Sequence, residues 1–594
     1  MKYLIILSVI SYTTLYIFAL RDLMDDLSRG IAVCYEKLNE STAAVLDTND
    51  NEKYLQVGNP IVNDFYDCTF RESGYVNNDQ INFSILKKAL LKSPVNLICS
   101  HKTSTMKTLS IIWLIVIVRA DILHFPDDFK FGVATAAYQI EGGWNASGKG
   151  ENIWDRMTHQ QPDKIKDGTN GDIACDSYNQ WKTDVQLLKD TGVHFYRFSL
   201  SWSRLLPNPI QKNVNSDGVR YYNDLIDELL KNNIEPMVTL YHWDLPQILQ
   251  DMGGWPNVAI SDYFKEYADV AFRLFGDRVK MWLTFNEPNE VCLAGYGTGS
   301  NAPGIKASGY LDYQCGRTIL LSHAKAYHLY NNTYRFHQKG KIGITLNSQW
   351  IESKTNLSVD HEASERAMQM ELGWWAHPIF SKNGNYPRVM IERVSMMSKC
   401  QNLNKSRLPE FTSNEVEFIK NTSDFFGLNH YSNWLASNVD KINCSYVSST
   451  NDKGVDKIQD PSWPPSAANW LKDVPWGFRK LLSWIKQEYN NPTVYVTENG
   501  FADLGELYDF GRIRYHQGYL NELLKAIHID KCKVTAYTAW SIIDNMEWED
   551  GYTLKFGLYY VNFSDPLRTR TPKLSAHFYK NIIKSRQLKN NQYK

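Results

Sequence analysis

Two glutamates stand at the ends of apolar segments that are far apart in the chain. Glu287 lies in the segment TFNEP, and Glu498 lies in the segment VTENG. Hydrolysis of a glycosidic bond needs two carboxyl groups: a carboxylic acid protonates the leaving oxygen, and a carboxylate meets the oxocarbenium-like carbon. If the carboxylate attacks directly, the two groups lie about 5–5.5 Å apart and the anomeric configuration is retained. This is the chemistry that the pair predicts.

Each glutamate also has a purely structural interpretation. A Glu before Pro, or before Asn-Gly, can be a turn or cap residue. For either motif alone, the structural and catalytic interpretations are about equally good. The two motifs together, on strands of the right order, favour the catalytic interpretation.

The elements that must position these residues lie between residues 121 and 594. Short apolar runs alternate there with amphipathic stretches such as 221–233 and 263–276. Eight runs are expected to form strands, at residues 129–138, 195–200, 234–243, 279–288, 341–347, 423–431, 493–500 and 534–545. Strands that alternate with helices form a parallel sheet, and eight such strands close a barrel. The predicted fold is therefore an α/β fold, a (β/α)8 TIM barrel.

Polar residues gather where the apolar runs stop. They are Gln139, Arg197, His242, Asn286, Glu287, Tyr431, Glu498 and Glu547. In (β/α)8 barrels the carboxyl ends of the strands carry the chemistry. A ring of polar side chains at these ends therefore predicts a site, with Glu287 on the fourth strand and Glu498 on the seventh.

The region from about 121 to 584 resembles glycoside hydrolase family 1, the β-glucosidase family, including its insect members. The similar segments, in the family's order, are FPDDFKFGVATAAYQIEGGWN, YRFSLSWSRLLP, YHWDLP, TFNEP, FFGLNHYS, YVTENG and AWSIIDNMEWEDGYTLKFGLYYVNF. The resemblance implies hydrolysis of terminal β-D-glucosyl residues by two-step double displacement. It also implies that Glu287 is the general acid/base, that Glu498 is the nucleophile, and that the partner is a small-molecule β-glycoside.

The resemblance assigns residues that support the two glutamates. Arg197 and Tyr431 match the pair that contacts the nucleophile, and a cation and a hydroxyl there favour an ionised Glu498. Glu287 must be protonated at rest, so burial and the nearby negative charge have to raise its pKa. Asn429 fits the family pattern as a further nucleophile-supporting residue.

The sugar-binding residues follow from the same resemblance. Asn286 matches the residue that holds the substrate 2-hydroxyl. The other matches to the glycone pocket are Gln139, His242, Trp540, Glu547 and Trp548. Gln, His and Glu side chains suit vicinal hydroxyls, and Trp540 offers a stacking face; core packing is the alternative role for this tryptophan.

Two segments of the chain have the character of signal peptides. Residues 1–20 combine Lys2 with an apolar run, and residues 106–120 combine Lys107 with a second apolar run that ends at Ala120. Both suit a signal peptide better than a membrane anchor. Residues 21–105 are expected to be helical and resemble an insect odorant-binding protein that is cut off before its last cysteine. We favour a fusion of two genes over an unfamiliar propeptide, and we expect no contribution to catalysis from this part.

The composition of the chain indicates which classes of partner, cofactor and location are expected. A formal net charge of −1 without charged blocks argues against nucleic acid and membrane surfaces as partners. Nine cysteines without a CxxC pair and fourteen histidines without a close cluster predict that there is no metal site, and no organic cofactor is expected. Nine N-x-S/T sequons beside two signal-like segments favour secretion, for example into a gut lumen. The oligomeric state does not follow from the sequence.

Two other functions stay open. The first is a thioglucosidase that acts on glucosinolates, since insect thioglucosidases can retain both glutamates. The second is a catalytically inactive sugar-binding relative, although such relatives typically lack one of the two glutamates. A 6-phospho-β-glycosidase is disfavoured, because EWED at 547–550 places acids where a phosphate needs cations. The natural aglycone is not predicted; its specificity is expected to lie in loops such as 301–315 and 436–470.

Overall fold

The chain divides into two units, Met1–Asp121 and Ile122–Lys594, and the computed structural model describes residues 76–77, 80–81, 124–441 and 443–588. In the first unit, β1 (Val76–Asn77) pairs antiparallel with β2 (Gln80–Ile81). The predicted signal peptides at 1–20 and 106–120 lie outside the described residues, as does most of the predicted helical segment 21–105. These assignments stay predictions.

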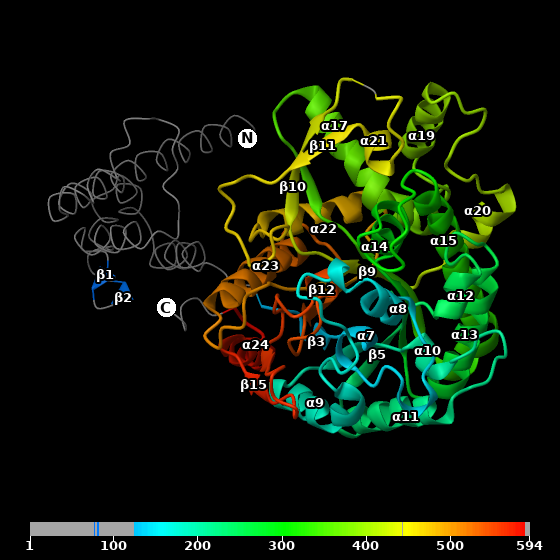
Figure 1. Cartoon of the computed structure of the whole chain (residues 1–594). Coiled ribbons are helices and arrows are strands. Elements are labelled where there is room, and N and C mark those ends of the chain that lie inside the picture. Colours follow the sequence, from blue (N-terminus) through cyan, green and yellow to red (C-terminus); the bar gives the residue numbers. More distant parts are fainter. Residues whose placement is uncertain (1–75, 78–79, 82–123, 442, 589–594) are drawn as a thin grey trace, which may run out of the picture. The chain divides into compact units, whose positions relative to one another are not determined.

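The second unit is built around a closed barrel of eight parallel strands (Figure 1). The strands are β3 (Lys130–Ala134), β4 (Phe195–Ser199), β5 (Glu235–Tyr241), β6 (Met281–Asn286), β7 (Lys341–Asn347), β9 (Phe426–Asn429), β12 (Val494–Asn499) and β13 (Val534–Trp540). They follow one another around the barrel in chain order, and β13 closes it by pairing with β3. All eight predicted strands are confirmed, and with them the TIM-barrel fold.

The barrel strands are buried on both faces, which explains their nearly continuous apolar sequence. In β5, only the first residue, Glu235, is exposed. Side chains near the amino ends of the strands form a cluster inside the barrel, made of Phe195, Met237, Leu283, Phe425 and Ala536. Gly132 leaves room for this cluster, because a Cβ at that position would lie 2.4 Å from the ring of Phe195. The packed amino end leaves the carboxyl end of the barrel for a site.

Helices surround the barrel (Figure 1). They include α9 (Ser177–Thr191), α11 (Ser216–Lys231), α13 (Ile260–Phe275), α15 (Leu311–Leu329), α22 (Trp476–Glu488), α23 (Phe510–His528) and α24 (Leu574–Ser585). In α11, the Asn215 side chain accepts a hydrogen bond from the first turn, and Lys231 lies in the last turn, where a cation favours the helix dipole. Tyr222, Leu225 and Leu229 recur on one buried face. The amphipathic stretches at 221–233 and 263–276 overlap α11 and α13, as predicted.

Structure that the sequence did not predict lies beside the carboxyl end of the barrel. A three-stranded sheet is formed by β8 (Trp350–Ser353), β10 (Asn433–Asn438) and β11 (Val455–Ile458), which follow the barrel strands β7 and β9 along the chain. One disulfide, Cys292–Cys315, joins α14 (Pro288–Cys292) to α15, and a second joins Cys400 to Cys444. In the described part of the chain, none of the helices is long and apolar enough to cross a membrane.

Candidate active site

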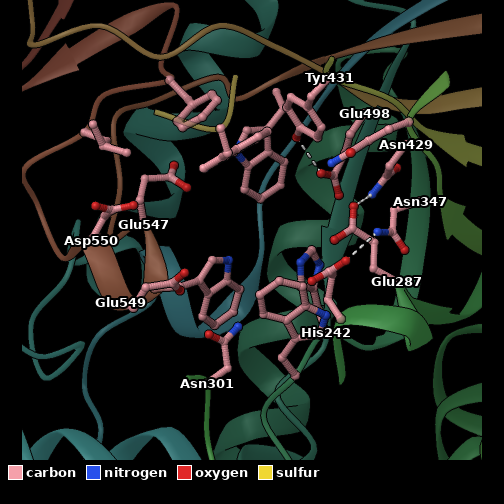
Figure 2. A pocket seen from close by; sticks show the side chains of 18 of the residues that line it. His242, Glu287, Asn301, Asn347, Asn429, Tyr431, Glu498, Glu547, Glu549 and Asp550 are labelled. Carbon is pink, nitrogen blue, oxygen red and sulfur yellow. Dashed lines mark hydrogen bonds between the residues drawn. The ribbon is translucent and has the colours of Figure 1, made fainter. Parts of the chain in front are cut away.

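Glu498 lies one residue before the end of β12 and is 4% exposed. Arg197 from β4 donates a hydrogen bond of 2.5 Å to its Oε1. The Tyr431 hydroxyl donates one of 2.7 Å to its Oε2 (Figure 2). Burial and the charge of Glu498 raise the pKa of Tyr431, so this hydroxyl keeps the proton that it donates. A cation on one oxygen and a donor on the other favour the carboxylate form, which a nucleophile requires.

Glu287 directly follows β6, and its backbone adopts the left-handed region with φ 48° and ψ 62°. This conformation costs on the order of 1–3 kcal/mol for a residue other than glycine and is often found at functional sites. The Glu287 N–H donates to the carbonyl oxygen of Thr345 in β7 over 3.0 Å, and Pro288 begins α14. The chain therefore turns sharply at this residue, and its carboxyl group lies beside Glu498 in the barrel mouth (Figure 2).

The surroundings of Glu287 favour its protonated form. Burial raises the pKa of Glu287 well above its ordinary value, and the negative charges of Glu498 and Glu290 raise it further. Asn429 donates a hydrogen bond of 2.7 Å to Glu287 Oε1 and, with Arg197, opposes the shift without reversing it. The Asn429 side chain therefore contacts the predicted acid/base and not the nucleophile that it was expected to support. Two adjacent carboxyl groups with opposite protonation are what an acid next to a nucleophile requires.

A buried hydrogen-bond network beneath the two glutamates centres on Asn286. Its Oδ1 accepts from Arg197 over 2.6 Å and from Asn429 over 3.1 Å, and its Nδ2 donates to His242 Nε2 over 2.9 Å. Burial and the charge of Arg197 lower the pKa of His242, so its ring is neutral and carries its proton on Nδ1. Among the described residues this Nδ1 has no partner. Asn286 uses both polar atoms inside the protein, and its contact with a substrate 2-hydroxyl stays a prediction.

Glu547 lies across the cavity from Glu287 (Figure 2). Gln139, in α7 (Ala137–Ile140), donates hydrogen bonds to the Met546 carbonyl oxygen over 2.7 Å and to Glu547 Oε2 over 3.4 Å. Burial and the charge of Glu498 raise the pKa of Glu547. Gln139 Oε1 and Glu547 Oε1 are buried and have no partner in the described part of the chain. Since buried polar atoms are normally paired, two such acceptors indicate a ligand that donates hydrogen bonds, as sugar hydroxyls do.

Trp540 and Trp548 form an aromatic wall of the cavity. Trp540 ends β13, and the two side chains are buried. The His242 ring stacks on both, with centroid distances of 5.9 Å to Trp540 and 5.8 Å to Trp548, and Trp243 lies 4.5 Å from Trp548. Trp540 therefore packs into the core and also lines the cavity, so its core-packing and stacking roles are compatible.

The cavity has a volume of about 290 Å³, close to the lower end of the range for small-molecule sites. The predicted residues that line it are His242, Glu287, Asn429, Tyr431, Glu498, Trp540, Glu547 and Trp548. Gln139, Arg197 and Asn286 lie behind this lining and contact it through hydrogen bonds.

Several residues that line the cavity were not singled out from the sequence. They are Trp243, Glu290, Asn301, Asn347, Ser348, Gln349, Trp470, Leu554 and Phe556. Glu549 and Asp550 also line it, and the segment EWED at 547–550 had placed acids there. The position of Asn347 at the end of a predicted strand, and of Trp243 directly after His242, was a signal that could have identified both. Asn301 and Trp470 come from the two loops in which the aglycone specificity was expected. Among the described residues, no group of three or more His, Cys, Asp or Glu side chains could hold a metal ion.

Comparisons with known proteins show which family the chain resembles. The family model described as "Glycosyl hydrolase family 1" matches residues 122–588. The chain is 49% identical to "Myrosinase 1" of Brevicoryne brassicae over 467 residues, which cover 77% of this chain and 98% of that protein. It is 44% identical to "Cytosolic beta-glucosidase" of Homo sapiens over 469 residues, covering 78% and 99% of the two chains. The solved structure "Aphid myrosinase" superposes with a TM-score of 0.75 at 48% identity, covering 79% of this chain and all of that one.

Proposed function

The chain belongs to glycosyl hydrolase family 1 and is a glycosidase of the β-glucosidase type, and on that premise we propose that it is a secreted, retaining β-glucosidase. One observation carries the proposal. The surroundings of Glu287 raise its pKa and favour its protonated form. It lies beside Glu498, whose two carboxylate oxygens accept hydrogen bonds from Arg197 and Tyr431. The two groups suit the two roles of a double displacement.

In the first step, Glu498 attacks the anomeric carbon while Glu287 gives its proton to the glycosidic oxygen, and the aglycone leaves. A glucosyl group is then bonded covalently to Glu498. In the second step, Glu287 is a carboxylate and takes a proton from water, which attacks the anomeric carbon and releases Glu498. Two inversions at this carbon leave a product with the β configuration of the substrate.

The direct test is hydrolysis of 4-nitrophenyl β-D-glucoside by the full chain, with the first-formed sugar observed by NMR. We expect release of nitrophenol and β-glucose as the first anomer. A first-formed α anomer would contradict retention. Binding of glucosides without turnover would support the inactive sugar-binding alternative.

A thioglucosidase is the second candidate, and one observation favours it, the 49% identity to the protein named Myrosinase 1. A sulfur leaving group needs no acid for its departure. Burial and the neighbouring charge of Glu498 raise the pKa of Glu287. The site can therefore supply the proton that an oxygen leaving group needs. This feature suits a β-glucosidase, but it does not separate the two candidates by itself, because insect thioglucosidases can retain both glutamates.

The pair Gln139–Glu547 predicts which sugars are cleaved best. We expect both residues to bond the 4-hydroxyl, and Glu547 also to bond the 6-hydroxyl, through the oxygens that lack partners within the described residues. Glucosides and fucosides should then be best, galactosides slower, and mannosides poor because we expect Asn286 to bond an equatorial 2-hydroxyl. A typical hydrogen bond makes a net contribution of about 0.5–1.5 kcal/mol. Glu547→Ala should therefore lower kcat/KM for glucosides about tenfold more than for fucosides, which lack the 6-hydroxyl; equal losses would show that Glu547 does not bind that group.

Secretion makes a prediction about the mature protein. The native secreted enzyme should begin near Asp121 and carry glycans at some of the sequons Asn145, Asn331, Asn356, Asn404, Asn421, Asn443 and Asn562. All of these asparagines reach solvent, and the two disulfides also suit an oxidising compartment. Asn145 is expected to stay unmodified, because it follows Trp144 close to the predicted site. N-terminal sequencing and the intact mass before and after deglycosylation check this; an N-terminus near residue 21, or an unchanged mass, would contradict it.

A further inference from the structure

Three carboxyl groups line the part of the cavity that faces solvent, and we name Glu290, Glu549 and Asp550 the outer acids. They differ in depth from the other acids of the cavity, Glu287, Glu498 and Glu547, which are all buried. Glu290 and Asp550 are partly exposed, and Glu549 is exposed. A sugar held by the buried residues would direct its aglycone toward this outer part.

The backbone fixes where the outer acids stand. Glu290 lies in the short helix α14, one turn after Glu287. Glu549 and Asp550 belong to the 3₁₀ helix η6 (Trp548–Asp550), which directly follows Glu547. In Figure 2, Glu549 and Asp550 lie on the Glu547 side of the cavity. Each of the outer acids is therefore close along the chain to a residue of the catalytic or sugar-binding set.

The cavity is acidic without compensation from its own walls. Six of the residues that line it are Asp or Glu, and in residues 124–441 and 443–588 no Lys or Arg lines it. Cations behind the walls offset part of this charge: Arg197 pairs with Glu498 over 2.5 Å, and Lys166 pairs with Asp550 over 3.1 Å at the surface. Lys453 and Lys457 share the single carboxylate of Glu371, and Lys457 also interacts with Glu290. Glu549 has no ion pair within the described residues, so the outer part of the cavity keeps an excess of carboxyl groups. A cleft lined by one sign of charge concentrates the electric field inside it.

Desolvation first, and neighbouring negative charge after it, act on the carboxyl group of Glu549. Although this residue reaches solvent, desolvation by the surrounding walls, and after it the charges of Asp550 and Glu290, raise the pKa of Glu549 to about 7. A further negative charge on a ligand would add to the same repulsion. A positive charge, or no charge, would not.

The uncharged groups of the outer cavity accept hydrogen bonds or offer flat apolar faces. Asn347 Nδ2 donates to Glu290 Oε1 over 2.8 Å, which leaves Asn347 Oδ1 as an acceptor without a partner among the described residues. Gln349 Oε1 is in the same state. The ring of Trp470 is 39% exposed and packs edge-on against Tyr431, with centroids 5.7 Å apart.

We propose that the outer acids select the aglycone by charge. The outer cavity accepts uncharged or cationic aromatic aglycones that donate hydrogen bonds, and it rejects aglycones with a fixed negative charge. This inference rests on the proposed β-glycosidase function. It also disfavours glucosinolates as substrates, because their aglycone carries a sulfate anion.

Three aryl β-glucosides with nearly equal leaving groups test the proposal on the full chain. The phenol carries a 4-carbamoylmethyl, a 4-carboxymethyl or a 4-(2-aminoethyl) group, so that only the charge of a remote substituent changes. We expect kcat/KM to be about tenfold lower for the carboxylate than for the amide in dilute buffer, and equal or higher for the amine. The penalty should shrink in 1 M salt, where the Debye length falls to about 3 Å.

Variants assign the effect to the outer acids. In Glu549→Gln combined with Asp550→Asn, the amide-to-carboxylate ratio of kcat/KM should fall to about two or three. The matched control is Glu235→Gln, which removes an exposed carboxylate at the amino end of β5, the opposite end of the barrel, and should leave the ratio unchanged. Two results would overturn the proposed charge selection and leave the glucosidase function standing. One is a carboxylate substrate that is cleaved as well as the amide, and the other is a ratio that the double variant does not change. Failure to cleave the uncharged amide would instead refute the proposed glucosidase, and the inference with it.

Discussion

Glu498→Gln is expected to abolish turnover of every β-glycoside, with a loss on the order of 10⁴–10⁶-fold in kcat. An amide in place of the carboxylate cannot form the glycosyl ester, and the ion pair with Arg197 Nη1 is lost as well. The measurement is steady-state hydrolysis of 4-nitrophenyl β-D-glucoside by the purified variant. The reference is the wild-type rate at the same protein concentration. A Tm equal to that of the wild type shows that the variant is folded.

The covalent intermediate gives an independent check of the same assignment. An activated 2-deoxy-2-fluoroglucoside should release a burst of its leaving group from the wild type and leave the sugar bonded to Glu498. Peptide mass mapping then identifies the labelled residue. A label on another residue, or an active Glu498→Gln variant, would refute the nucleophile. Glu498→Asp is the conservative comparison, since it keeps the charge and changes only the reach of the carboxylate.

Glu287→Gln should produce a loss that depends strongly on the leaving group. General acid catalysis contributes about 10²–10⁴-fold. The rate of glycosyl-enzyme formation should therefore fall by that factor with alkyl glucosides, whose leaving oxygen needs a proton. It should form the glycosyl-enzyme at a nearly normal rate with 2,4-dinitrophenyl glucoside, whose phenolate leaves unaided. If the rate of glycosyl-enzyme formation fell equally with good and poor leaving groups, the role of Glu287 would be contradicted.

The pH profile tests Glu287 in the wild type. Burial and then the charges of Glu498 and Glu290 raise the pKa of Glu287, and catalysis of the first step needs its protonated form. Activity on poor leaving groups should therefore be present below this pKa and be lost as the pH rises through it. In Glu287→Gln, this alkaline limb should disappear. An alkaline limb that is the same in both proteins would have to come from another group.

The barrel could be predicted because its signals are local. An apolar run such as 341–347 must be a strand when helical stretches flank it, and β7 (Lys341–Asn347) has these bounds in the structure. The sheet of β8, β10 and β11 carries no such signal, because its strands are short and only partly buried. Their pairing depends on where the loops after β7 and β9 meet, which is a long-range property.

The candidate site divides in the same way. Glu287 and Glu498 were predictable because each stands at or near the end of a strand, and parallel strands in a barrel end at one rim. Arg197 lies in the middle of β4, and its role came from the resemblance to the family. Glu290 was not predictable, because it occupies the short helix α14, whose sequence has no periodicity pointing into the cavity. Glu549 and Asp550 were expected near the sugar from the segment EWED at 547–550, but not in the outer part of the cavity. Their place in its lining became visible only with the folded loops.

The sequence by itself determined the eight strands, their order and the residue types at their ends, because periodicity and strand polarity act within a few residues. Tertiary structure alone decided which hydrogen bonds those residues form and which of them are protonated. Arg197 and Glu498 are 301 positions apart, yet they share a hydrogen bond because the barrel closes. The same closure buries Glu287 beside a second carboxylate, and burial rather than residue type raises its pKa. Protonation, hydrogen-bond partners and the charge of the cavity depend on distances across the fold, and no local pattern in the chain encodes those distances.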